Sequence, residues 1–454
     1  MGSGISGLAA AHTLQRSADV TLFEAGDYFG GHTHTVDVTL RMAHGNTTRN
    51  VTHGVDTGFL VFNERTYPGL ISLLAALNVT TAKSDMSFSV QSHNPNTGKR
   101  IEWSGTSVNA LFAQRSNLMS WRFLKMLSDI LRFNRLCELV AGRDSEGQMR
   151  QTVGDFLKEN RFGDAFCEGY FLPMAACIWS CPTAQMLQFP MATMIRFCHN
   201  HGLLQITNRP QWWTVQGGAK HYVEKITSGI SDKRLNTPVR RIERVGKDRA
   251  GLGQAGVRIS TDTTQEWFDA VIIATHSDEA LLLLHEPTQL ERALLGAIKY
   301  HPNRAVLHTD ASVLPSRKAA WAAWNYERGG HSAGVCLHYL INRLQPLPWP
   351  QPVVVSLNPL REIPAQHVLG EYAYSHPVFD TAAIKAQRQI PWLQGQQNTY
   401  YCGAWTGYGF HEDGLKAGQL AATQLLSHHQ THHPTRQSNR PGNHHANPEE
   451  QVAA

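Results

Sequence analysis

The sequence predicts an α/β protein in which a discontinuous domain with a parallel sheet is interrupted by a second domain of mixed sheet and helices. Short β-branched runs recur near both ends of the chain and alternate with helix-compatible stretches. Residues 106–202 instead carry long helical patterns with Trp, Met and Leu on the apolar side. Strand–helix–strand alternation at both ends favours parallel βαβ units around an insertion.

Local patterns predict the individual elements. Residues 8–15 are small and apolar, which is compatible with a helix, and residues 20–23 (Val-Thr-Leu-Phe) are typical of a short strand. Residues 66–77 and 123–136 are expected to be helical. Further strands are expected at 88–90, 239–245, 256–260, 270–274, 307–308, 353–357 and 399–402.

Composition limits the classes to which the protein can belong. Its 454 residues are 42% hydrophobic and 17% charged, as in globular proteins of two or three domains. The net charge of +5 is too small to predict nucleic-acid binding. No apolar run approaches 18 residues and no signal peptide stands out, so we expect a cytoplasmic protein without a transmembrane segment. Seven cysteines fit a reduced compartment, and peripheral membrane contact and oligomeric state stay open.

A complete G-x-G-x-x-G motif opens the chain. It consists of Gly2, Gly4 and Gly7, with Ser6 inside it, and it leads into the first predicted helix. The glycines permit a tight turn, a close approach of backbone to a pyrophosphate, and close helix packing. Glu24 ends the next predicted strand, about 20 residues on, where a carboxylate accepts ribose hydroxyls. Together these features predict a Rossmann-like dinucleotide site.

A strand is expected before the first glycine of such a motif, and only Met1 stands there. Our hypothesis is that roughly six apolar residues, the usual length of a strand, are missing. Loss of a central parallel strand is expected to weaken folding and retention of the dinucleotide.

Several further segments carry a family resemblance. They are Glu24-Ala25, Gly30-Gly31-His32-Thr33, the run DTGFLVFNERTYP at 56–68, Trp103-Ser104-Gly105, YCGAW at 401–405 and DGLKAG at 413–418. This combination resembles the superfamily of flavin-containing amine oxidases and carotenoid (phytoene) desaturases. It is most similar to a bacterial branch described only as NAD/FAD-binding or amine-oxidase-like. The resemblance covers about residues 2–425.

The resemblance implies FAD rather than NAD, bound in a discontinuous Rossmann-like domain of the glutathione-reductase type. Many relatives carry arginines beside the paired glycines, where Tyr28 and His32 stand here. Gly217-Gly218 resembles a further glycine pair of the superfamily. The residues expected to contact FAD are Gly2, Gly4, Ser6, Gly7, Glu24, Ala25, Gly30, Gly31, His32, Thr33, Val239, Ala274, Gly403, Asp413, Gly414 and Leu415.

The C-terminal motif is expected to meet the flavin ring. A helix that begins near Asp413 and Gly414 would direct its positive end at the ring and stabilise the negative charge of reduced flavin. Tyr408 and Tyr374 are expected to face the flavin, and His411 is our choice for a proton carrier. We could not place the lysine that amine oxidases use.

The FAD-binding domain is expected to comprise residues 1–80, 203–285 and 390–426, and the substrate domain residues 81–202 and 286–389. Residues 427–454, rich in His, are expected to be a disordered tail. Tryptophans and a methionine suggest a broad apolar cavity: Trp179, Trp212, Trp213, Trp321, Trp324 and Met174. No metal site is expected, and the spacing of Cys177 and Cys181 favours structural cysteines.

The preferred function is an FAD-dependent oxidoreductase that transfers a hydride from a C–C or C–N bond of a small, lipid-like molecule to flavin. Two alternatives stay open. One is a true amine oxidase that releases hydrogen peroxide, and the other is a non-catalytic flavin-binding partner protein. Pocket residues vary most within such folds, so the substrate is the least determined feature.

Overall fold

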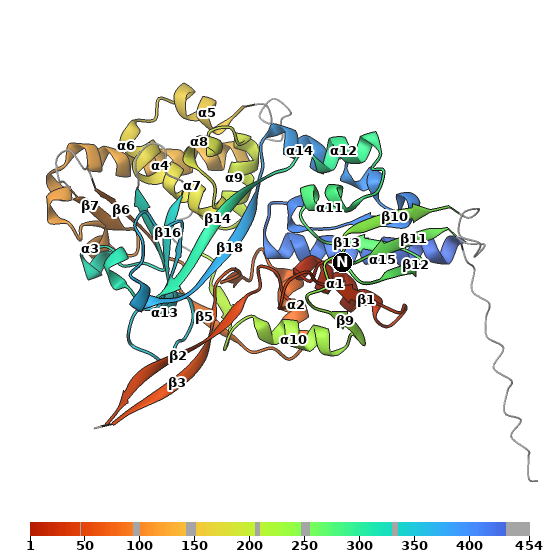
Figure 1. Ribbon diagram of the computed structural model, residues 1–454. Coiled ribbons are helices and arrows are strands. Elements are labelled where there is room, and N and C mark those ends of the chain that lie inside the picture. Colours follow the sequence, from red (N-terminus) through yellow and green to blue (C-terminus); the bar gives the residue numbers. More distant parts are fainter. Residues whose placement is uncertain are drawn as a thin grey trace, which may run out of the picture.

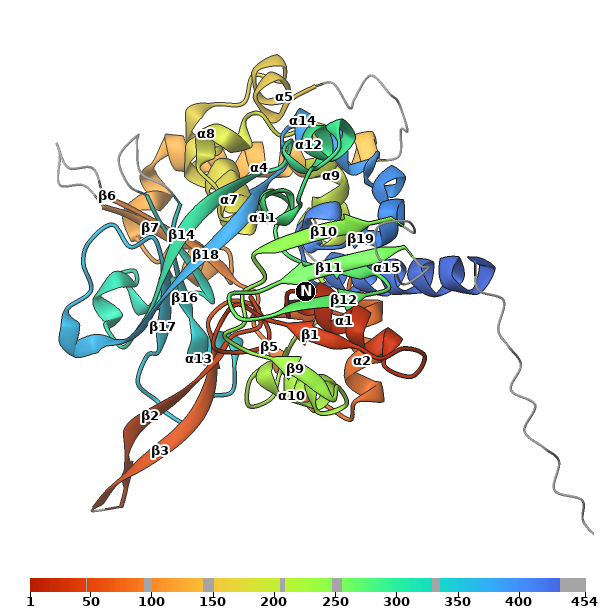
Figure 2. The same cartoon turned by 45° about the vertical axis from the view of Figure 1, so that its right-hand side comes forward.

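The computed structural model describes residues 1–45, 47–93, 100–141, 151–204, 209–246, 255–328 and 335–432. They form a mixed α/β fold (Figures 1 and 2). A large mixed sheet lies on one side. A group of short sheets lies on the other side, around helices α1 (Ile5–Leu14) and α15 (His411–His432), which are far apart in the sequence.

Two parallel strand pairs lie beside the N-terminal helix α1 (Ile5–Leu14). β1 (Thr21–Phe23) pairs with β9 (Asp232–Arg234), and β13 (Val271–Ile273) pairs with β19 (Thr399–Tyr401). An antiparallel sheet of three strands lies next to them: β10 (Arg241–Val245), β11 (Gly256–Ser260) and β12 (Gln265–Phe268).

The first two residues bridge the parallel pairs. The amino group of Met1 donates to the carbonyl of Ile272 (2.9 Å), and the amide of Ala274 donates to the carbonyl of Met1 (2.8 Å). The amide of Gly2 donates to the carbonyl of Phe23 at the end of β1 (2.9 Å). The backbone leading into α1 thus lies between β1 and β13.

The large sheet has seven strands. Their order is β18 (Val368–Val378), β14 (Lys299–His308), β17 (Val354–Leu357), β16 (Cys336–Leu340), β15 (Trp324–Arg328), β6 (Phe88–His93) and β7 (Arg100–Ser104). The pair β15–β6 is parallel and the other pairs are antiparallel. Helices gather on one side of this sheet and share its apolar core (Figure 1). They are α4 (Trp121–Ala141), α5 (Val153–Glu159), α6 (Asp164–Phe166), α7 (Leu172–Trp179), α8 (Thr183–Met186) and α9 (Met191–Asn200).

A long hairpin, β2 (Thr35–His44) and β3 (Thr47–Asp56), projects from the body of the molecule (Figure 1). Apolar and polar residues alternate along β2, and a turn follows at Gly45, which is a sequence pattern typical of a β-hairpin. The strands predicted from the sequence do not include this segment. The other elements are β4 (Phe62–Asn63), α2 (Pro68–Ala76), β5 (Thr81–Ser84), α3 (Val108–Leu111), β8 (Trp212–Val215), α10 (Lys220–Ser228), α11 (Ser277–Leu283), α12 (Gln289–Leu295), α13 (Ile341–Leu344), α14 (Thr381–Gln387) and α15 (His411–His432).

The structure departs from the predicted boundaries at two places. Helix α15 continues to His432, so the expected disorder from Ser427 is wrong for its first six residues. The hydroxyl of Tyr400 hydrogen-bonds to Nδ1 of His428 (2.9 Å) and helps to hold this last part of the helix. Residues 433–454 lie outside the described residues. Helices α12 and α14 share a core with β10, β11 and β13, although they fall within the range assigned to the substrate domain.

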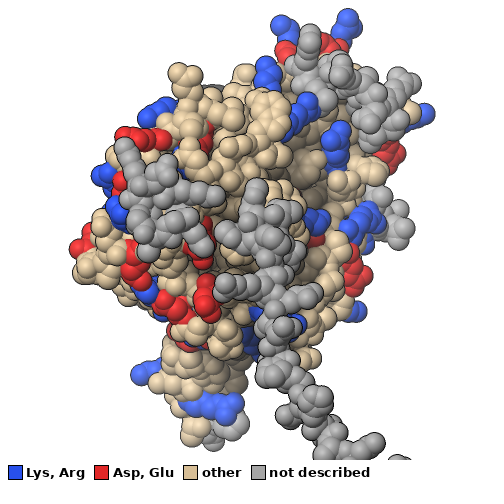
Figure 3. Space-filling model, turned by 90° about the vertical axis from the view of Figure 1, so that its right-hand side faces the viewer, with Lys and Arg blue, Asp and Glu red and all other residues tan. Residues whose placement is uncertain are grey.

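The face of the molecule in Figure 3 carries acidic and basic side chains interspersed with one another. Among the described residues, no helix combines the length and the hydropathy that crossing a bilayer requires.

Helices α1 and α15 pack side by side in parallel. A Cβ on Gly414 would lie 2.7 Å from Cγ2 of Ile5, and a Cβ on Gly418 would lie 2.0 Å from the backbone oxygen of Ser6. Further along both helices, Ala422 packs with Ala10. The two helices therefore run in the same direction and can approach this closely only because glycine is present.

We predict that Gly418→Ala lowers the free energy of unfolding by about 1–3 kcal/mol, because the new methyl group meets backbone that cannot move aside cheaply. Urea denaturation checks this. The control is Gly246→Ala, where a Cβ meets nothing within 4 Å and the change should stay within about 0.5 kcal/mol. Equal stability of the two variants would contradict the tight helix contact.

Candidate cofactor and substrate cavity

One cavity of about 1140 Å³ lies where the glycine-rich loop meets the large sheet. Its wall combines two sets of residues. The first set comes from the predicted dinucleotide site: Gly2, Gly4, Ser6, Glu24, Ala25, Gly30, Gly31, His32, Val239, Ala274, Gly403 and His411. The second set comes from the region expected to hold substrate: Met86, Phe88, Trp103, Tyr170, Met174, Ile178, Phe197, Trp212, Trp324 and Tyr339.

The glycines of the N-terminal motif meet three different needs. A Cβ on Gly7 would lie 1.8 Å from the carbonyl oxygen of Gly2, so Gly7 allows α1 to pack on its own entry turn. Gly2 has a φ of +86°, which favours glycine. A Cβ on Gly4 would meet nothing within 4 Å, so the backbone there faces open space at the N-terminus of α1. This is the arrangement that a phosphate group requires.

Glu24 follows β1 and is held by the motif itself. Its Oε2 accepts hydrogen bonds from the amide (2.8 Å) and the hydroxyl (2.5 Å) of Ser3, and its Oε1 accepts from the amide of Gly26 (2.9 Å). A carboxylate has about four acceptor positions, so capacity remains for a ribose hydroxyl. The sequence reasoning did not assign a role to Ser3.

The second glycine pair lies directly against the first motif. Gly30 (φ +130°) and Gly31 (φ +58°) both have backbone angles that favour glycine, and a Cβ on Gly31 would lie 3.0 Å from Cα of Gly4. Tyr28 turns away to stack on His34, with 4.1 Å between ring centroids, and its hydroxyl donates to the carbonyl of Gly31 (3.1 Å). Tyr28 thus shapes the loop rather than entering the cavity wall.

Three histidines from distant segments meet in the wall of the cavity. The ring centroid of His32 lies 5.2 Å from that of His376 and 6.5 Å from that of His276. Burial lowers the pKa of His32 to about 4, and burial together with the neighbouring histidines lowers that of His376 to about 3. These two half-buried rings are therefore neutral at pH 7. The sequence reasoning foresaw His32 but not this grouping.

A hydrogen-bonded chain lies at the start of α15. Nε2 of His411 lies 2.7 Å from the hydroxyl of Tyr222, which in turn lies 2.5 Å from Oγ1 of Thr33. The His411 ring stacks on Phe59 with 3.8 Å between centroids. Burial, with a smaller contribution from the charge of His32, lowers the pKa of His411 to about 3. Sequence reasoning missed Tyr222, since α10 carries no recognisable motif there.

The other predicted residues of the C-terminal motif support the cavity from behind. Oδ2 of Asp413 accepts from the amides of Tyr408 (3.1 Å) and Phe410 (3.0 Å), so this carboxylate fixes the loop that precedes α15. Burial raises the pKa of Asp413 to about 6. Gly414 packs on α1 and Leu415 is fully buried in a core, and neither is among the cavity-lining residues.

Neither predicted catalytic tyrosine is among the lining residues. The Tyr374 hydroxyl contacts Oγ1 of Thr57 (2.8 Å) and Nδ1 of His34 (3.2 Å) at the base of the β2–β3 hairpin. Tyr408 is half-buried in the core of the substrate region, and its carbonyl accepts from the Trp179 indole (3.2 Å). Their contact with flavin stays a prediction.

The substrate side of the cavity is largely aromatic and aliphatic. Of the residues expected to build it, Trp212, Trp324 and Met174 line the wall. The other three do not: Trp213 donates to Glu64, Trp321 donates to a backbone carbonyl, and Trp179 is a core residue. Asp85 at the rim is paired with Arg343 (3.0 Å). The described lining residues include no lysine.

The cysteines are not crosslinked. All seven are free, and six of them are buried. Gly217 and Gly218 also stay away from the described cavity wall: they form the turn before α10, where a Cβ on Gly218 would meet Thr35 at 2.3 Å.

A glycine-rich helix N-terminus, an acidic residue at a strand end and an adjoining apolar chamber define a dinucleotide-dependent oxidoreductase. The family of flavin-containing amine oxidoreductases matches residues 5–346, and the chain belongs to this family. It is an FAD-dependent oxidoreductase. No curated protein gives a significant sequence match.

Solved structures of the same fold extend over nearly the whole chain. Cyclohexylamine oxidase from Brevibacterium oxydans is 15% identical, with a TM-score of 0.64, 94% of this chain and 98% of that chain covered. A putrescine oxidase bound to putrescine is 14% identical, with a TM-score of 0.63 and the same coverage. A fatty acid isomerase from P. acnes that produces CLA is 15% identical, with a TM-score of 0.62, 93% of this chain and 97% of that chain covered. At these identities the likeness shows the fold.

We predict that the free energy of unfolding falls as the pH is lowered from 7 to 4. The pKa values of His32, His376 and His411 are depressed in the folded state, whereas the unfolded chain binds protons near pH 6.5. Each histidine therefore removes up to about 1.4 kcal/mol per pH unit within this window. Urea denaturation at pH 7, 6 and 5 measures the slope. His376→Gln should make it shallower, whereas the exposed His199→Gln should not; equal slopes would contradict the assignment.

Proposed function

We propose that FAD binds in a discontinuous Rossmann-like domain, with its pyrophosphate at the N-terminus of α1 and a ribose at Glu24. Gly4 leaves open space at that helix end, where the first-turn amides have no partner within the helix and carry partial positive charge. Gly31, packed on Gly4, continues the same surface. Val239 and Ala274 in the cavity wall are the proposed contacts for the rest of the dinucleotide.

The flavin ring is proposed to lie beside His411, where α15 begins. Bound FAD supplies the hydride acceptor. The positive end of α15 favours negative charge beside it, and Asp413 holds the loop of Tyr408 and Phe410 in place. His411 is neutral and hydrogen-bonded to Tyr222, so its ring can take up a proton at Nδ1 while it releases one from Nε2 to Tyr222, whose hydroxyl passes its own proton to Thr33. Tyr408 and Tyr374 then act as positioning residues.

We further propose that the substrate is an apolar, lipid-like molecule that gives up a hydride from a C–H group, and a proton from the neighbouring atom, as a C–C or C–N bond is oxidised to a double bond. The apolar wall of the substrate side carries this proposal, because it excludes water and contributes few groups able to pair with a charged substrate. The rim carboxylate of Asp85 already pairs with Arg343. The named activities of the solved structures include both fatty acid isomerisation and amine oxidation, so the wall is the discriminating feature.

Anaerobic substrate screening tests the function. The purified protein, saturated with FAD, is mixed with long-chain unsaturated fatty acids and isoprenoids in one series and with primary amines and polyamines in another. Bleaching of the flavin absorbance by a member of the first series supports the proposal. Bleaching by amines alone, with hydrogen peroxide on aeration, would instead establish an amine oxidase. Isomerised lipid detected without net bleaching would identify an isomerase of the same substrate class. A spectrum that no compound changes would favour a non-catalytic flavin-binding protein.

We predict that Glu24→Gln raises the Kd for FAD about 10- to 100-fold, because hydrogen bonds to a charged acceptor contribute about 1.5–3 kcal/mol. Titration of the apoprotein with FAD, followed by flavin fluorescence, measures this change. The control is Glu286→Gln, whose side chain is 83% exposed. An unchanged Kd in the Glu24 variant would remove the ribose contact from the proposal without affecting the substrate.

A further inference from the structure

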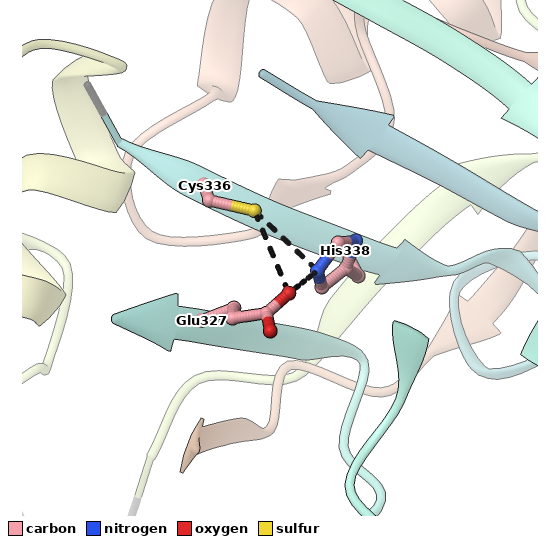
Figure 4. Close-up of side chains that lie close together, drawn as sticks. All are labelled: Glu327, Cys336 and His338. Carbon is pink, nitrogen blue, oxygen red and sulfur yellow. Dashed lines mark hydrogen bonds and ion pairs between the residues drawn. The ribbon is translucent and has the colours of Figure 1, made fainter. Parts of the chain in front are cut away.

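A second group of reactive side chains lies in the large sheet, and none of its members is among the residues that line the cavity. Glu327 in β15 and Cys336 and His338 in β16 point toward one another (Figure 4). Nε2 of His338 lies 3.0 Å from Oε2 of Glu327 and 3.4 Å from Sγ of Cys336. Sγ of Cys336 lies 4.0 Å from the same carboxylate oxygen.

We propose that Glu327, Cys336 and His338 form a binding site for a divalent zinc ion. Zinc is held by thiolate, imidazole and carboxylate at about 2.0–2.3 Å, and tetrahedral geometry then separates the ligand atoms by roughly 3.3–3.6 Å. The three observed separations bracket this range. A mixed S, N and O set favours Zn²⁺ over Mg²⁺ or Ca²⁺.

The backbone fixes this constellation. In the antiparallel pair β15–β16, Glu327 is directly opposite Cys336, and His338 is opposite Asn325. Side chains two residues apart on a strand share one face of the sheet. All three ligands therefore project from the same face, at the end of the hairpin where β15 stops at Arg328 and β16 begins at Cys336.

A supporting shell orients the imidazole. Nδ1 of His338 lies 2.7 Å from Oγ of Ser356, and Nε2 of His308 lies 2.7 Å from the same oxygen. Nδ1 of His308 accepts from the amide of Asp310 (3.1 Å), so the proton of a neutral His308 sits on Nε2 and points at Ser356. The serine oxygen can accept from both rings, which leaves Nε2 of His338 free for a metal.

The charges of the three proposed ligands and the accessibility of the site from solvent also fit a zinc ion. A carboxylate, a thiolate and a neutral imidazole together carry two negative charges, which one Zn²⁺ neutralises. On binding, the Cys336 thiol releases one proton to solvent, and the His338 proton moves from Nε2 to Nδ1. His338 is 1% exposed, whereas the side chain of Glu327 is 26% exposed, so the carboxylate forms the entrance. Zinc would join β15 to β16 at the end of the pair where β15 stops and β16 begins.

The test uses the full chain, stripped with EDTA and dialysed, then given one equivalent of Zn²⁺ or Co²⁺. We expect one tightly held zinc per chain by elemental analysis after gel filtration, and a thiolate-to-cobalt charge-transfer band in the absorbance spectrum. Cys336→Ser should lose both signals, whereas Cys137→Ser, another buried cysteine, should keep them. The band separates this site from the histidines of residues 427–454, since imidazole ligands do not produce it.

Two milder variants keep the test decisive if Cys336→Ser does not fold. Glu327→Gln preserves the shape of a partly exposed side chain, and Ser356→Ala removes only the supporting hydroxyl. Each should raise the Kd for Zn²⁺ about 10- to 100-fold while the circular dichroism spectrum stays unchanged. Absence of the cobalt band in the unaltered chain, or equal affinity in all variants, would overturn the zinc site.

Discussion

The contact between α1 and α15 is the constraint on which the cavity depends. The two helices begin 406 residues apart in sequence, yet they run parallel and both present their first turns to the same cavity. Glycines at 414 and 418 make this approach possible. A helix N-terminus offers partial positive charge without any basic side chain. The proposed FAD would therefore meet two such ends, one at its pyrophosphate and one at its flavin ring.

Among the described residues that line the cavity, three arginines are matched in number by three carboxylates: Arg209, Arg240 and Arg343, and Glu24, Asp85 and Glu279. Beside the paired glycines, Tyr28 braces a loop and His32 is neutral at pH 7. Burial suppresses protonation of the neighbouring His376 and of His411 as well. Backbone amides and neutral rings therefore lie beside the arginines in this wall. The same dry surroundings suit the apolar substrate that we propose.

Several elements of the fold and of the candidate site could be predicted from the sequence, because each is determined by residues that are neighbours in the chain. The glycine motif, Glu24, the short strands and the helix at 123–136 each depend on residues close together in the chain. Pairings over long distances left no comparable signal. Tyr222 meets His411 across 189 residues, and His32 meets His376 across 344. Tyr408 was placed by the C-terminal motif and Tyr374 by the family resemblance, and neither carries information on which way the ring will point.

The β2–β3 hairpin couples the outer surface of the molecule to its interior. Its root at Asp56 is a buried carboxylate that accepts from Thr35, from the amide of Ala219 and from Gln345, and burial raises its pKa to about 7. Thr33, two residues before the hairpin, belongs to the hydrogen-bonded chain of His411. The hairpin is thus anchored in the interior at Asp56, and Thr33 before it closely follows the glycine pair Gly30 and Gly31.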